Sequence, residues 1–241
     1  MITAILLAGG TGVRMGTHGM PKQFLPLYGK PIICYTIEVF ENCEEVDQII
    51  IPCTQDWTGH MSKLVERYRF QKVKQVVPGG VDRQNSIINA LNVLEDVEPE
   101  DLVLVHDGVR PLVQNETIEE NIRVAKIHGN AMTVKQAIET IVVTESDTAE
   151  LSHFKNRDHT YTLTSPQTFR VNELMGVYAA INEVKGQEIP ILDAALLFAT
   201  AGKTMHMVRE TGLNIKITTP EDFYYLRSYL ELKENRDILG A

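Results

Sequence analysis

The sequence predicts an α/β fold with a doubly wound, mostly parallel, Rossmann-like sheet. Short apolar runs, typical of buried strands, alternate along the chain with segments whose apolar residues recur at helical spacing. Glycine-rich or polar turns follow several of these runs. The length of 241 residues, 44% of them hydrophobic, is enough for a sizeable core. We therefore expect a single domain over residues 1–241.

The first half of the chain alternates regularly between the two patterns. Strands are expected over Ile5–Ala8, Val46–Pro52, Val73–Val77, Leu102–Val105 and Ala131–Ala137. Helices are expected between them, over Pro31–Phe40, Asp56–Tyr68, Arg83–Glu95 and Thr117–His128. Pro31 suits the first turn of a helix, and Asp56 is the expected N-cap of the next one. In sheets of this kind ligands bind at the carboxyl ends of the strands.

The pattern changes between Glu139 and Tyr161. A β-like run is followed there by a polar, acidic turn and a weaker second run that carries basic residues and histidines. We expect a β-arm over about 139–161, because neither run has a helical face that could dock on the sheet. An isolated hairpin is marginal in water, so the arm predicts a homodimer built by exchanged arms. After it we expect helices over Val171–Val184, Asp193–Ala201 and Pro220–Lys233, and a strand over Thr204–Val208.

The stretch from Ile2 to Leu27 has the features of a phosphate cradle. Its apolar strand runs into glycines at 9, 10, 12 and 16, with Arg14 among them and Lys22 directly after Pro21. Glycines allow successive main-chain N–H groups to point into one concavity, which binds anions. The planar guanidinium of Arg14 and the mobile ammonium group of Lys22 would allow such a site to bind several phosphate charges. We interpret the stretch as a nucleoside triphosphate site.

Two familiar glycine-rich motifs do not fit this stretch. A Walker loop requires Lys-Ser or Lys-Thr after its last glycine, and Gly16 is followed by Thr17 and His18. A dinucleotide fingerprint requires a third glycine, where Met15 stands, and an acidic residue at the end of the second strand. Because no acid ends the run over Gln48–Cys53, an oxidoreductase with a dinucleotide site is disfavoured.

Asp107 is the candidate metal ligand. It ends a wholly apolar strand, so its carboxylate is expected at the rim of the sheet, where Mg²⁺ would bind one carboxylate together with phosphate oxygens. A salt bridge with Arg110 or a helix cap would be the purely structural alternative. His106 is interpreted as an oriented structural residue rather than a base. The remaining candidate reacting groups are Arg14, Lys22, Arg157 and Lys216.

Composition narrows the class of protein. A net charge of −9 argues against nucleic acid as a partner, and it requires that an anionic substrate be held by a local cluster of cations. No apolar run approaches the roughly 18 residues of a membrane span, so we expect a cytoplasmic protein without a membrane segment. The three cysteines have neither zinc nor disulfide spacing, and buried thiols are expected.

Six motifs together resemble one enzyme family. LAGGTGVRMG, PKQFLPL, GGVDRQNSI, VHDGVRP, SPQTF and NIKITTPEDF occur in the order found in the sugar-alcohol-phosphate cytidylyltransferases, which act on D-ribitol 5-phosphate or 2-C-methyl-D-erythritol 4-phosphate. The resemblance covers essentially the whole chain. It implies a nucleotidyltransferase that moves CMP from CTP to a polyol phosphate, releases pyrophosphate and needs Mg²⁺. It also implies a homodimer in which a β-arm reaches the neighbouring active site.

The resemblance also assigns roles by matching position. Arg14, Lys22, Asp107 and Lys216 would be catalytic, and Asp107 would hold the metal. CTP would be bound by Ala8, Gly9, Gly10, Thr11, Gly12, Arg14, Lys22, Gly80, Asp82, Arg83 and Ser86. The polyol phosphate would be bound by Asp107, Arg110, Thr140, Arg157 of the partner arm, Ser165 and Lys216.

Some positions depart from the family pattern, and some of these favour the ribitol type. Gly108-Val109 replaces an Ala-Ala pair common in the erythritol enzymes, and Gly9-Gly10-Thr11 and Asp56-Trp57 look more like the ribitol type. Ser165 stands where the family usually has threonine, and it keeps the hydroxyl. Leu192-Asp193 stands where the family usually has Thr-Asp, so the resemblance leaves one contact to the polyol hydroxyls unassigned. We expect CDP-ribitol as the product. The alternatives are a methylerythritol phosphate enzyme of isoprenoid biosynthesis and a non-catalytic nucleotide-binding protein. The pathway, whether teichoic acid, capsule or isoprenoid, stays open.

Overall fold

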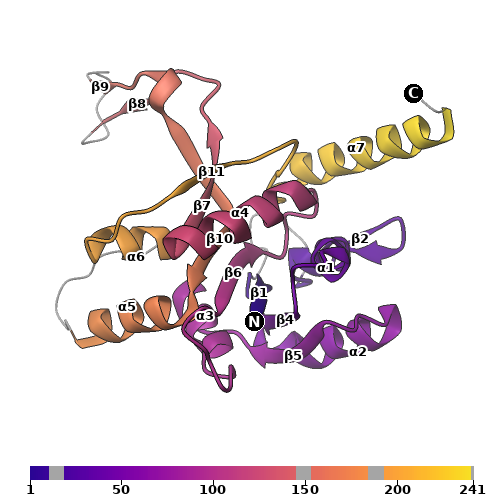
Figure 1. Ribbon diagram of the computed structural model, residues 1–241. Coiled ribbons are helices and arrows are strands. Elements are labelled where there is room, and N and C mark those ends of the chain that lie inside the picture. The colour runs from indigo at the N-terminus through magenta and orange to yellow at the C-terminus, as the bar shows by residue number, and fades with distance from the viewer. Residues whose placement is uncertain (11–18, 145–152, 184–192, 240–241) are drawn as a thin grey trace.

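The computed structural model describes residues 1–10, 19–144, 153–183 and 193–239. Its centre is a seven-stranded sheet in the order β11-β7-β10-β6-β1-β4-β5 (Figure 1). The strands are β1 (Ile2–Leu7), β4 (Gln48–Cys53), β5 (Val73–Pro78), β6 (Leu102–Asp107), β7 (Asn130–Gln136), β10 (Tyr161–Arg170) and β11 (Met207–Arg209). β10 runs antiparallel to β6 and β7, and the other neighbouring pairs of this sheet are parallel. The predicted mostly parallel sheet is confirmed.

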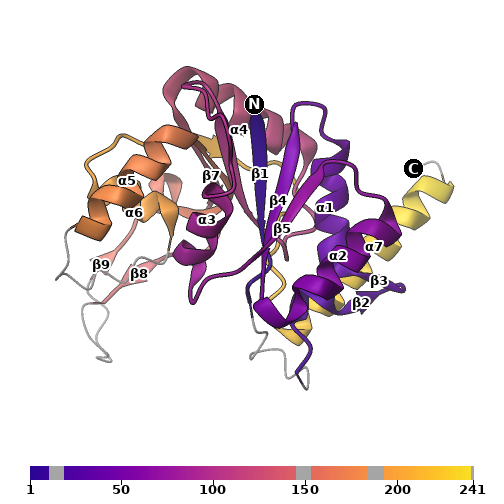
Figure 2. The same ribbon diagram turned by 90° about the horizontal axis from the view of Figure 1, so that it is seen from below.

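Helices cover both faces of the sheet. They are α1 (Ile32–Asn42), α2 (Thr58–Tyr68), α3 (Arg83–Leu91), α4 (Asn115–His128), α5 (Val171–Glu183), α6 (Ala194–Thr200) and α7 (Pro220–Leu239). Seen from below, α3, α5 and α6 lie on one side of the sheet, and α1, α2 and α7 lie on the other (Figure 2). This is the doubly wound arrangement that alternating strands and helices predict.

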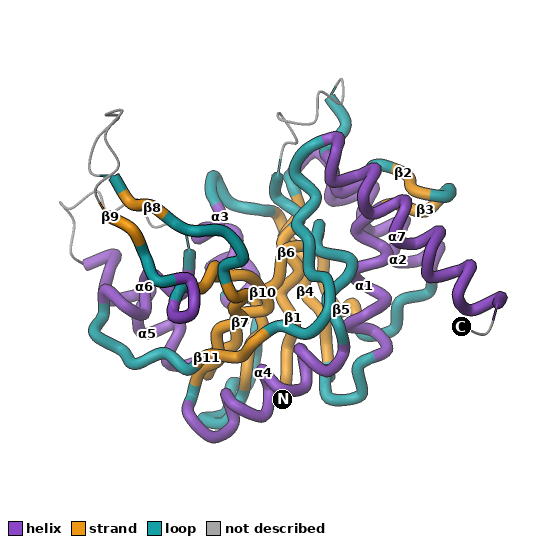
Figure 3. The backbone as a smooth tube through the Cα atoms, turned by 90° about the horizontal axis from the view of Figure 1, so that it is seen from above, coloured by secondary structure: helices purple, strands orange, loops and turns teal. Residues whose placement is uncertain are grey.

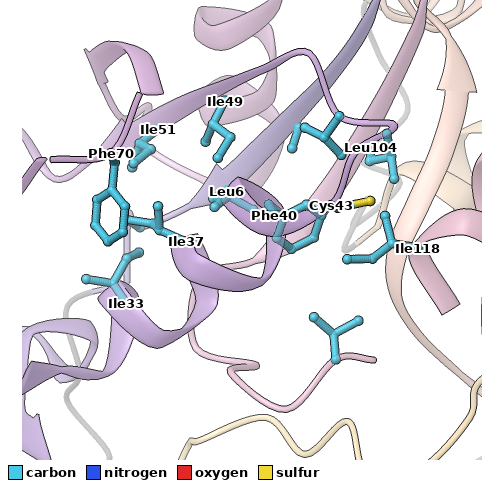
Figure 4. Packing of buried hydrophobic residues seen from close by; sticks show 14 of the residues in the cluster. Leu6, Ile33, Ile37, Phe40, Cys43, Ile49, Ile51, Phe70, Leu104 and Ile118 are labelled. Atoms are coloured by element: carbon cyan, nitrogen blue, oxygen red, sulfur yellow. The ribbon is translucent and has the colours of Figure 1, made fainter. Parts of the chain in front are cut away.

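Alternate side chains of the central strands enter two separate cores. Leu6, Ile49 and Leu104 pack with Phe40 and other residues of α1, α2 and α4 (Figure 4). Ile5 lies on the opposite face, in a core shared with α3, α5 and α6. Because both faces of β1 and β6 are buried, most of their residues are apolar, as expected for the centre of a parallel sheet. Burial of both faces fixes the direction of these strands and therefore the position of the residues that directly follow them.

A third, smaller core attaches the C-terminal helix beside the end of β6. Val109 and Leu112 pack there with Ile217 and with Leu226 of α7. The main-chain N–H of Ile217 also donates to the carbonyl of Val109 over 2.9 Å. This packing brings the segment before α7 next to the loop after β6, although the two are about a hundred residues apart in sequence (Figure 3).

The predicted arm is a hairpin that projects from the sheet (Figure 1). It leaves β7 and returns to β10 with a hydrogen bond from the Ala137 N–H to the Thr160 carbonyl, 2.9 Å long. The short strands β8 (Val142–Val143) and β9 (His153–Phe154) then pair antiparallel, and a 3-10 turn over Arg157–His159 follows. Residues 145–152, between β8 and β9 in sequence, lie outside the described part of the chain.

Sequence expectations need correction at several elements, since β1 begins at Ile2, β4 covers Gln48–Cys53 and α7 continues to Leu239. Asp56 does not cap α2, which begins after a 3-10 turn over Gln55–Trp57 and has no side-chain cap. α3 ends at Leu91 rather than Glu95, because the chain turns there and Leu94 packs on the core. β11 is shorter than expected and begins at Met207. The antiparallel strand β10 was not predicted. No helix of the described residues is long and apolar enough to span a membrane.

Candidate active site

The carboxyl ends of the central strands enclose a polar cavity of about 300 Å³. Most of the residues that the sequence singled out for nucleotide binding and catalysis line it. Its walls are formed by Leu7, Gly9, Gly10, Lys22, Gln23, Gly80, Val81, Asp82, Arg83, Ser86, Asp107, Val109 and Lys216. The structure therefore brings together the ends of β1, β5 and β6 and the segment before α7, in agreement with the rule for parallel sheets.

One wall is formed by main chain and a single buried lysine. After β1, Gly9 and Gly10 present bare backbone to the cavity, and a Cβ at residue 10 would lie 3.8 Å from Cε of Lys22. Lys22 belongs to the 3-10 turn Lys22–Phe24 and is 9% exposed. Gln23 fixes this turn, since its side-chain Nε2 donates to the Ala8 carbonyl over 2.6 Å. Thr11, Gly12 and Arg14 lie outside the described residues.

The opposite wall is a tight turn held by the start of α3. Asp82 caps this helix by accepting from the Asn85 N–H over 2.7 Å. The Ser86 hydroxyl donates to the Asp82 carbonyl and accepts from the Gly80 N–H at 3.0 Å. A Cβ at Gly80 would lie 2.2 Å from the Cβ of Asn85, so the turn can close only on a glycine. The side chains of Asp82 and Ser86 thus shape the wall.

Asp107 stands between three cations. Its Oδ1 accepts from Nη1 of Arg83 at 2.5 Å, and its Oδ2 lies 2.9 Å from Nε of Arg110 and 3.1 Å from Nζ of Lys216. Burial raises the pKa of this carboxyl, but the positive charges of Arg83, Lys216 and Arg110 outweigh it and hold the pKa well below the usual 3.8. Asp107 is therefore ionised at neutral pH, inside a locally positive site of an acidic protein.

A buried histidine supports this carboxylate from behind. His106 is fully buried, its Nε2 donates to the Arg110 carbonyl at 3.2 Å, and its Nδ1 accepts from the Ser165 hydroxyl at 3.0 Å. The Ser165 oxygen also accepts from the Asp107 N–H at 3.3 Å. Burial lowers the pKa of His106 to about 3, so the imidazole is neutral, as a structural rather than a basic residue requires.

The predicted acceptor-binding residues do not all reach the cavity. Arg110 and Lys216 contact Asp107 directly. Ser165 is 1% exposed and lies behind the wall, where its hydroxyl is engaged with His106. Thr140 and Arg157 are exposed on the arm and are absent from the lining of the cavity of their own chain. The single chain thus gathers the nucleotide residues but leaves the arm residues outside.

Sequence reasoning missed five residues that the structure places in or beside the site, among them Leu7 and Val81 of the cavity lining. Gln23 and Val109 line the cavity, and the buried Asn214 accepts from Nη1 of Arg110 through its main-chain carbonyl at 2.6 Å. Gln23 and Asn214 stand inside the motifs PKQFLPL and NIKITTPEDF, beside the lysines that drew attention there. An amide beside a charged residue carries no signal of its own, because its importance depends on burial.

The arrangement suits a ligand with several negative charges. Main-chain groups of Gly9 and Gly10 line a small cavity together with the side chains of Lys22, Arg83 and Lys216, and Arg110 contacts Asp107, another residue of the lining. Such a site can neutralise and orient phosphates without a nucleophilic side chain. Within the described residues, no group of three or more His, Cys, Asp or Glu side chains could by itself hold a metal ion.

Comparison with known proteins decides the family. The model of the 2-C-methyl-D-erythritol 4-phosphate cytidylyltransferase (IspD) family matches residues 2–232. The chain belongs to the IspD family of cytidylyltransferases. Over all 241 residues it is 38% identical to ribitol-5-phosphate cytidylyltransferase of Streptococcus agalactiae serotype III (strain NEM316) and 36% identical to that of Vibrio parahaemolyticus serotype O3:K6, each covered in full. It is accordingly a nucleotidyltransferase.

Solved structures of IspD proteins share the fold of this cytidylyltransferase. The 4-diphosphocytidyl-2C-methyl-D-erythritol synthase of Anaerococcus prevotii superposes with a TM-score of 0.82 over 96% of both chains, at 24% identity. The 2-C-methyl-D-erythritol 4-phosphate cytidylyltransferase of Francisella tularensis gives a TM-score of 0.73, with 93% of this chain and 97% of that one covered, at 26% identity. The expected α/β fold of the family is thereby confirmed.

Proposed function

We propose that this cytidylyltransferase transfers CMP from CTP to D-ribitol 5-phosphate, giving CDP-ribitol and pyrophosphate. One observation carries the transfer: a small cavity lined by glycine main chain, Lys22 and Asp107, with three cations grouped around that carboxylate. The acceptor follows from sequence, because the full-length relatives at 36–38% identity carry the ribitol name. The whole chain, with its arm at about 139–161, would form one nucleotidyltransferase domain.

CTP would lie across the ends of β1, β5 and β6. The triphosphate would follow the main chain from Ala8 through Gly12, with Lys22 and Arg14 as its counter-charges. The cytosine would lie against the turn at Gly80, whose shape depends on Asp82 and Ser86. Arg83, which reaches Asp107, would join the nucleotide wall to the reacting end. The bare main chain of Gly9 and Gly10 in the cavity lining supports this path for the phosphates.

The reaction would be an in-line displacement. An acceptor phosphate oxygen forms the new bond to the α-phosphorus of CTP, and the bond from that phosphorus to the β-bridging oxygen breaks, so pyrophosphate leaves with the electron pair. Phosphate oxygens are already ionised near neutral pH, so no general base is required. Lys22 and Lys216 would offset the charge that gathers on the five-coordinate α-phosphorus. Catalysis would rest on positioning and charge neutralisation.

The acceptor phosphate would be held by the cations beside Asp107. Arg110 already has a fixed plane, because its guanidinium contacts both Asp107 and the Asn214 carbonyl. Lys216 is more exposed and can follow the substrate. Thr140 and Arg157 would act from the arm of a second subunit. Ser165 would contribute its hydroxyl only by leaving His106, so we assign it the weakest part of this binding set.

Magnesium fits the site on one condition. Asp107 offers a carboxylate at the cavity wall, and Mg²⁺ commonly takes one carboxylate plus phosphate oxygens. Both carboxylate oxygens are paired with cations, so a phosphate must draw at least one of these side chains away before Asp107 can bind a metal. When bound there, Mg²⁺ would neutralise triphosphate charge and help to orient the α-phosphate.

The arm supports a homodimer. Ile138, Val143 and Phe154 are 74%, 46% and 63% exposed on the projecting hairpin, which is unusual for apolar residues without a partner. We propose that the arm covers a second subunit and brings Arg157 to its cavity. Mixing Lys22→Ala with Arg157→Ala subunits tests this, since only a trans arrangement restores one intact site per mixed dimer. No recovery of activity after mixing would reject the exchanged arm.

Pyrophosphate release tests the function. The purified protein is incubated with each of the four nucleoside triphosphates and Mg²⁺, alone or with ribitol 5-phosphate or methylerythritol phosphate. We expect release only with CTP, and fastest with ribitol 5-phosphate. Faster release with methylerythritol phosphate would support the alternative, which the family description and the solved neighbours favour. No release under any pairing would support a non-catalytic nucleotide-binding protein.

A further inference from the structure

The segment between β11 and α7 holds a buried polar chain that the proposed chemistry does not itself require. Its side chains are Glu210 and Asn214, each 4% exposed, and the more exposed Lys216 lies two residues beyond Asn214. We infer that Asn214 is a positioning residue that orients Arg110 and Lys216 for the acceptor phosphate and ties both to the base of the arm. This inference rests on the proposed function and adds a residue to its acceptor site.

The main chain of Asn214 fixes the guanidinium of Arg110. Nη1 of Arg110 donates to the Asn214 carbonyl over 2.6 Å, while Nε of the same group donates to Oδ2 of Asp107 over 2.9 Å. A planar group held at two points keeps its orientation. Lys216 lies two residues further on, and its Nζ is 3.1 Å from the same Asp107 oxygen. Displacing residue 214 would therefore move both cations.

The side chain of Asn214 holds that main chain in place. Its Nδ2 donates to the Ser165 carbonyl at 2.6 Å and to Oε2 of Glu210 at 3.2 Å. Both acceptors are buried, so they would be left without this donor if the amide were removed. The amide thus joins the segment to β10 at the residue whose hydroxyl contacts His106.

Glu210 continues the chain to the base of the arm. Its Oε2 also accepts from the Thr164 hydroxyl at 3.0 Å, and its main-chain N–H donates to the Val134 carbonyl at 2.9 Å. Lys135 lies 3.8 Å from its other oxygen. β7 and β10, which carry these partners, run directly into the hairpin. The same polar chain therefore contacts β7 and β10, the strands that carry the arm, at one end and Asp107 at the other.

The test compares two buried asparagines. Asn121 is a matched control, because it is fully buried in α4 and its Nδ2 makes two donor bonds of 2.8 Å, to the Thr117 carbonyl and to the Thr133 hydroxyl. Both Asn214→Ala and Asn121→Ala should lower the melting temperature. We expect only Asn214→Ala to raise KM for ribitol 5-phosphate, by about tenfold or more, and to change KM for CTP by less than about twofold.

Equal effects of the two substitutions on KM, or an unchanged acceptor KM in Asn214→Ala, would overturn the inference while the activity of the wild-type protein stands. If Asn214→Ala does not fold, Asn214→Ser, which keeps a hydroxyl donor, is measured against Asn121→Ser.

A second readout does not depend on turnover: NMR hydrogen exchange of the Arg110 Nε–H, assigned with Arg110→Lys. We expect Asn214→Ala to speed this exchange by about tenfold and Asn121→Ala to leave it unchanged. Equal exchange in the two variants would also reject the positioning role.

Discussion

The neutral, fully buried His106 makes the stability of the protein depend on pH. Its pKa is lowered from 6.5 to about 3 by burial of a ring that is 0% exposed. The folded-state pKa lies below the unfolded value, so the unfolded chain takes up the proton first as the pH falls. The contribution of His106 is therefore complete above pH 6.5 and is lost between 6.5 and about 3.

The size of this loss follows from the shift. Each pH unit below the unfolded pKa costs about 1.4 kcal/mol as long as the folded protein stays unprotonated. Lowering the pH from 7 to 5 should thus remove about 2 kcal/mol of unfolding free energy through His106 alone. Asp107 works in the same direction, but its share is lost only below its usual pKa of 3.8, and so falls outside this window.

The measurement is a pair of denaturant unfolding curves at pH 7 and pH 5, in EDTA, for the wild type and for His106→Gln. The glutamine keeps a polar group but does not titrate, and all other ionisable groups are common to the two proteins. We expect the variant to be less stable than the wild type at pH 7. Between pH 7 and pH 5 the variant should lose about 2 kcal/mol less unfolding free energy than the wild type. Equal losses in both proteins would refute the reasoning.

Three further substitutions or titrations test other parts of the site. Lys22→Ala should lower kcat/KM by about a thousandfold without changing the melting temperature. Lys63→Ala, which removes an exposed lysine of α2, should change neither kcat/KM nor the melting temperature. An active Lys22→Ala enzyme would contradict the charge role of Lys22. Gly80→Ala should cost about 1–3 kcal/mol in chemical unfolding, because the new Cβ meets Asn85. Gly176 in α5 has open space around it, so Gly176→Ala should be neutral or stabilising by up to about 1 kcal/mol. A similar loss of unfolding free energy in Gly80→Ala and Gly176→Ala would remove the steric argument. Mn²⁺ binding can be followed by electron paramagnetic resonance. The affinity for Mn²⁺ should rise at least about tenfold when a non-hydrolysable CTP analogue is present, because phosphates must first draw cations away from Asp107. Equal affinity with and without the analogue would exclude binding of nucleotide before metal.

The sequence was most informative where the chain is locally consistent. The apolar runs that became β1 and β6 are buried on both faces, so composition alone marked them as central strands. Their ends then located Gly9 and Asp107 at one edge of the sheet before any contact was known. β10 escaped prediction because its first half is polar and exposed and it carries Pro166, which is rare inside a strand. Its place between β6 and β7 is set by tertiary pairing.

Side-chain partners were less predictable than positions. A salt bridge between Asp107 and Arg110 was foreseeable because the residues are three apart, but Arg83 reaches the same carboxylate from a different helix. Ser165 matches a substrate-binding motif, and yet the structure directs its hydroxyl to His106. Asn214 gave no signal in the sequence because its weight comes from burial. Such contacts depend on how β10 and the segment before α7 pack against β6.

The central claim is that the nucleotide triphosphate lies along the turn after β1 and meets the acceptor phosphate beside Asp107. A crystal structure with a non-hydrolysable CTP analogue, Mg²⁺ and ribitol 5-phosphate tests it most directly. We expect the β- and γ-phosphates on the main chain of Gly9 and Gly10 and on Lys22, the base against Gly80, and the acceptor phosphate between Arg110 and Lys216. Triphosphate density away from that turn, or an acceptor phosphate remote from both cations, would contradict the account.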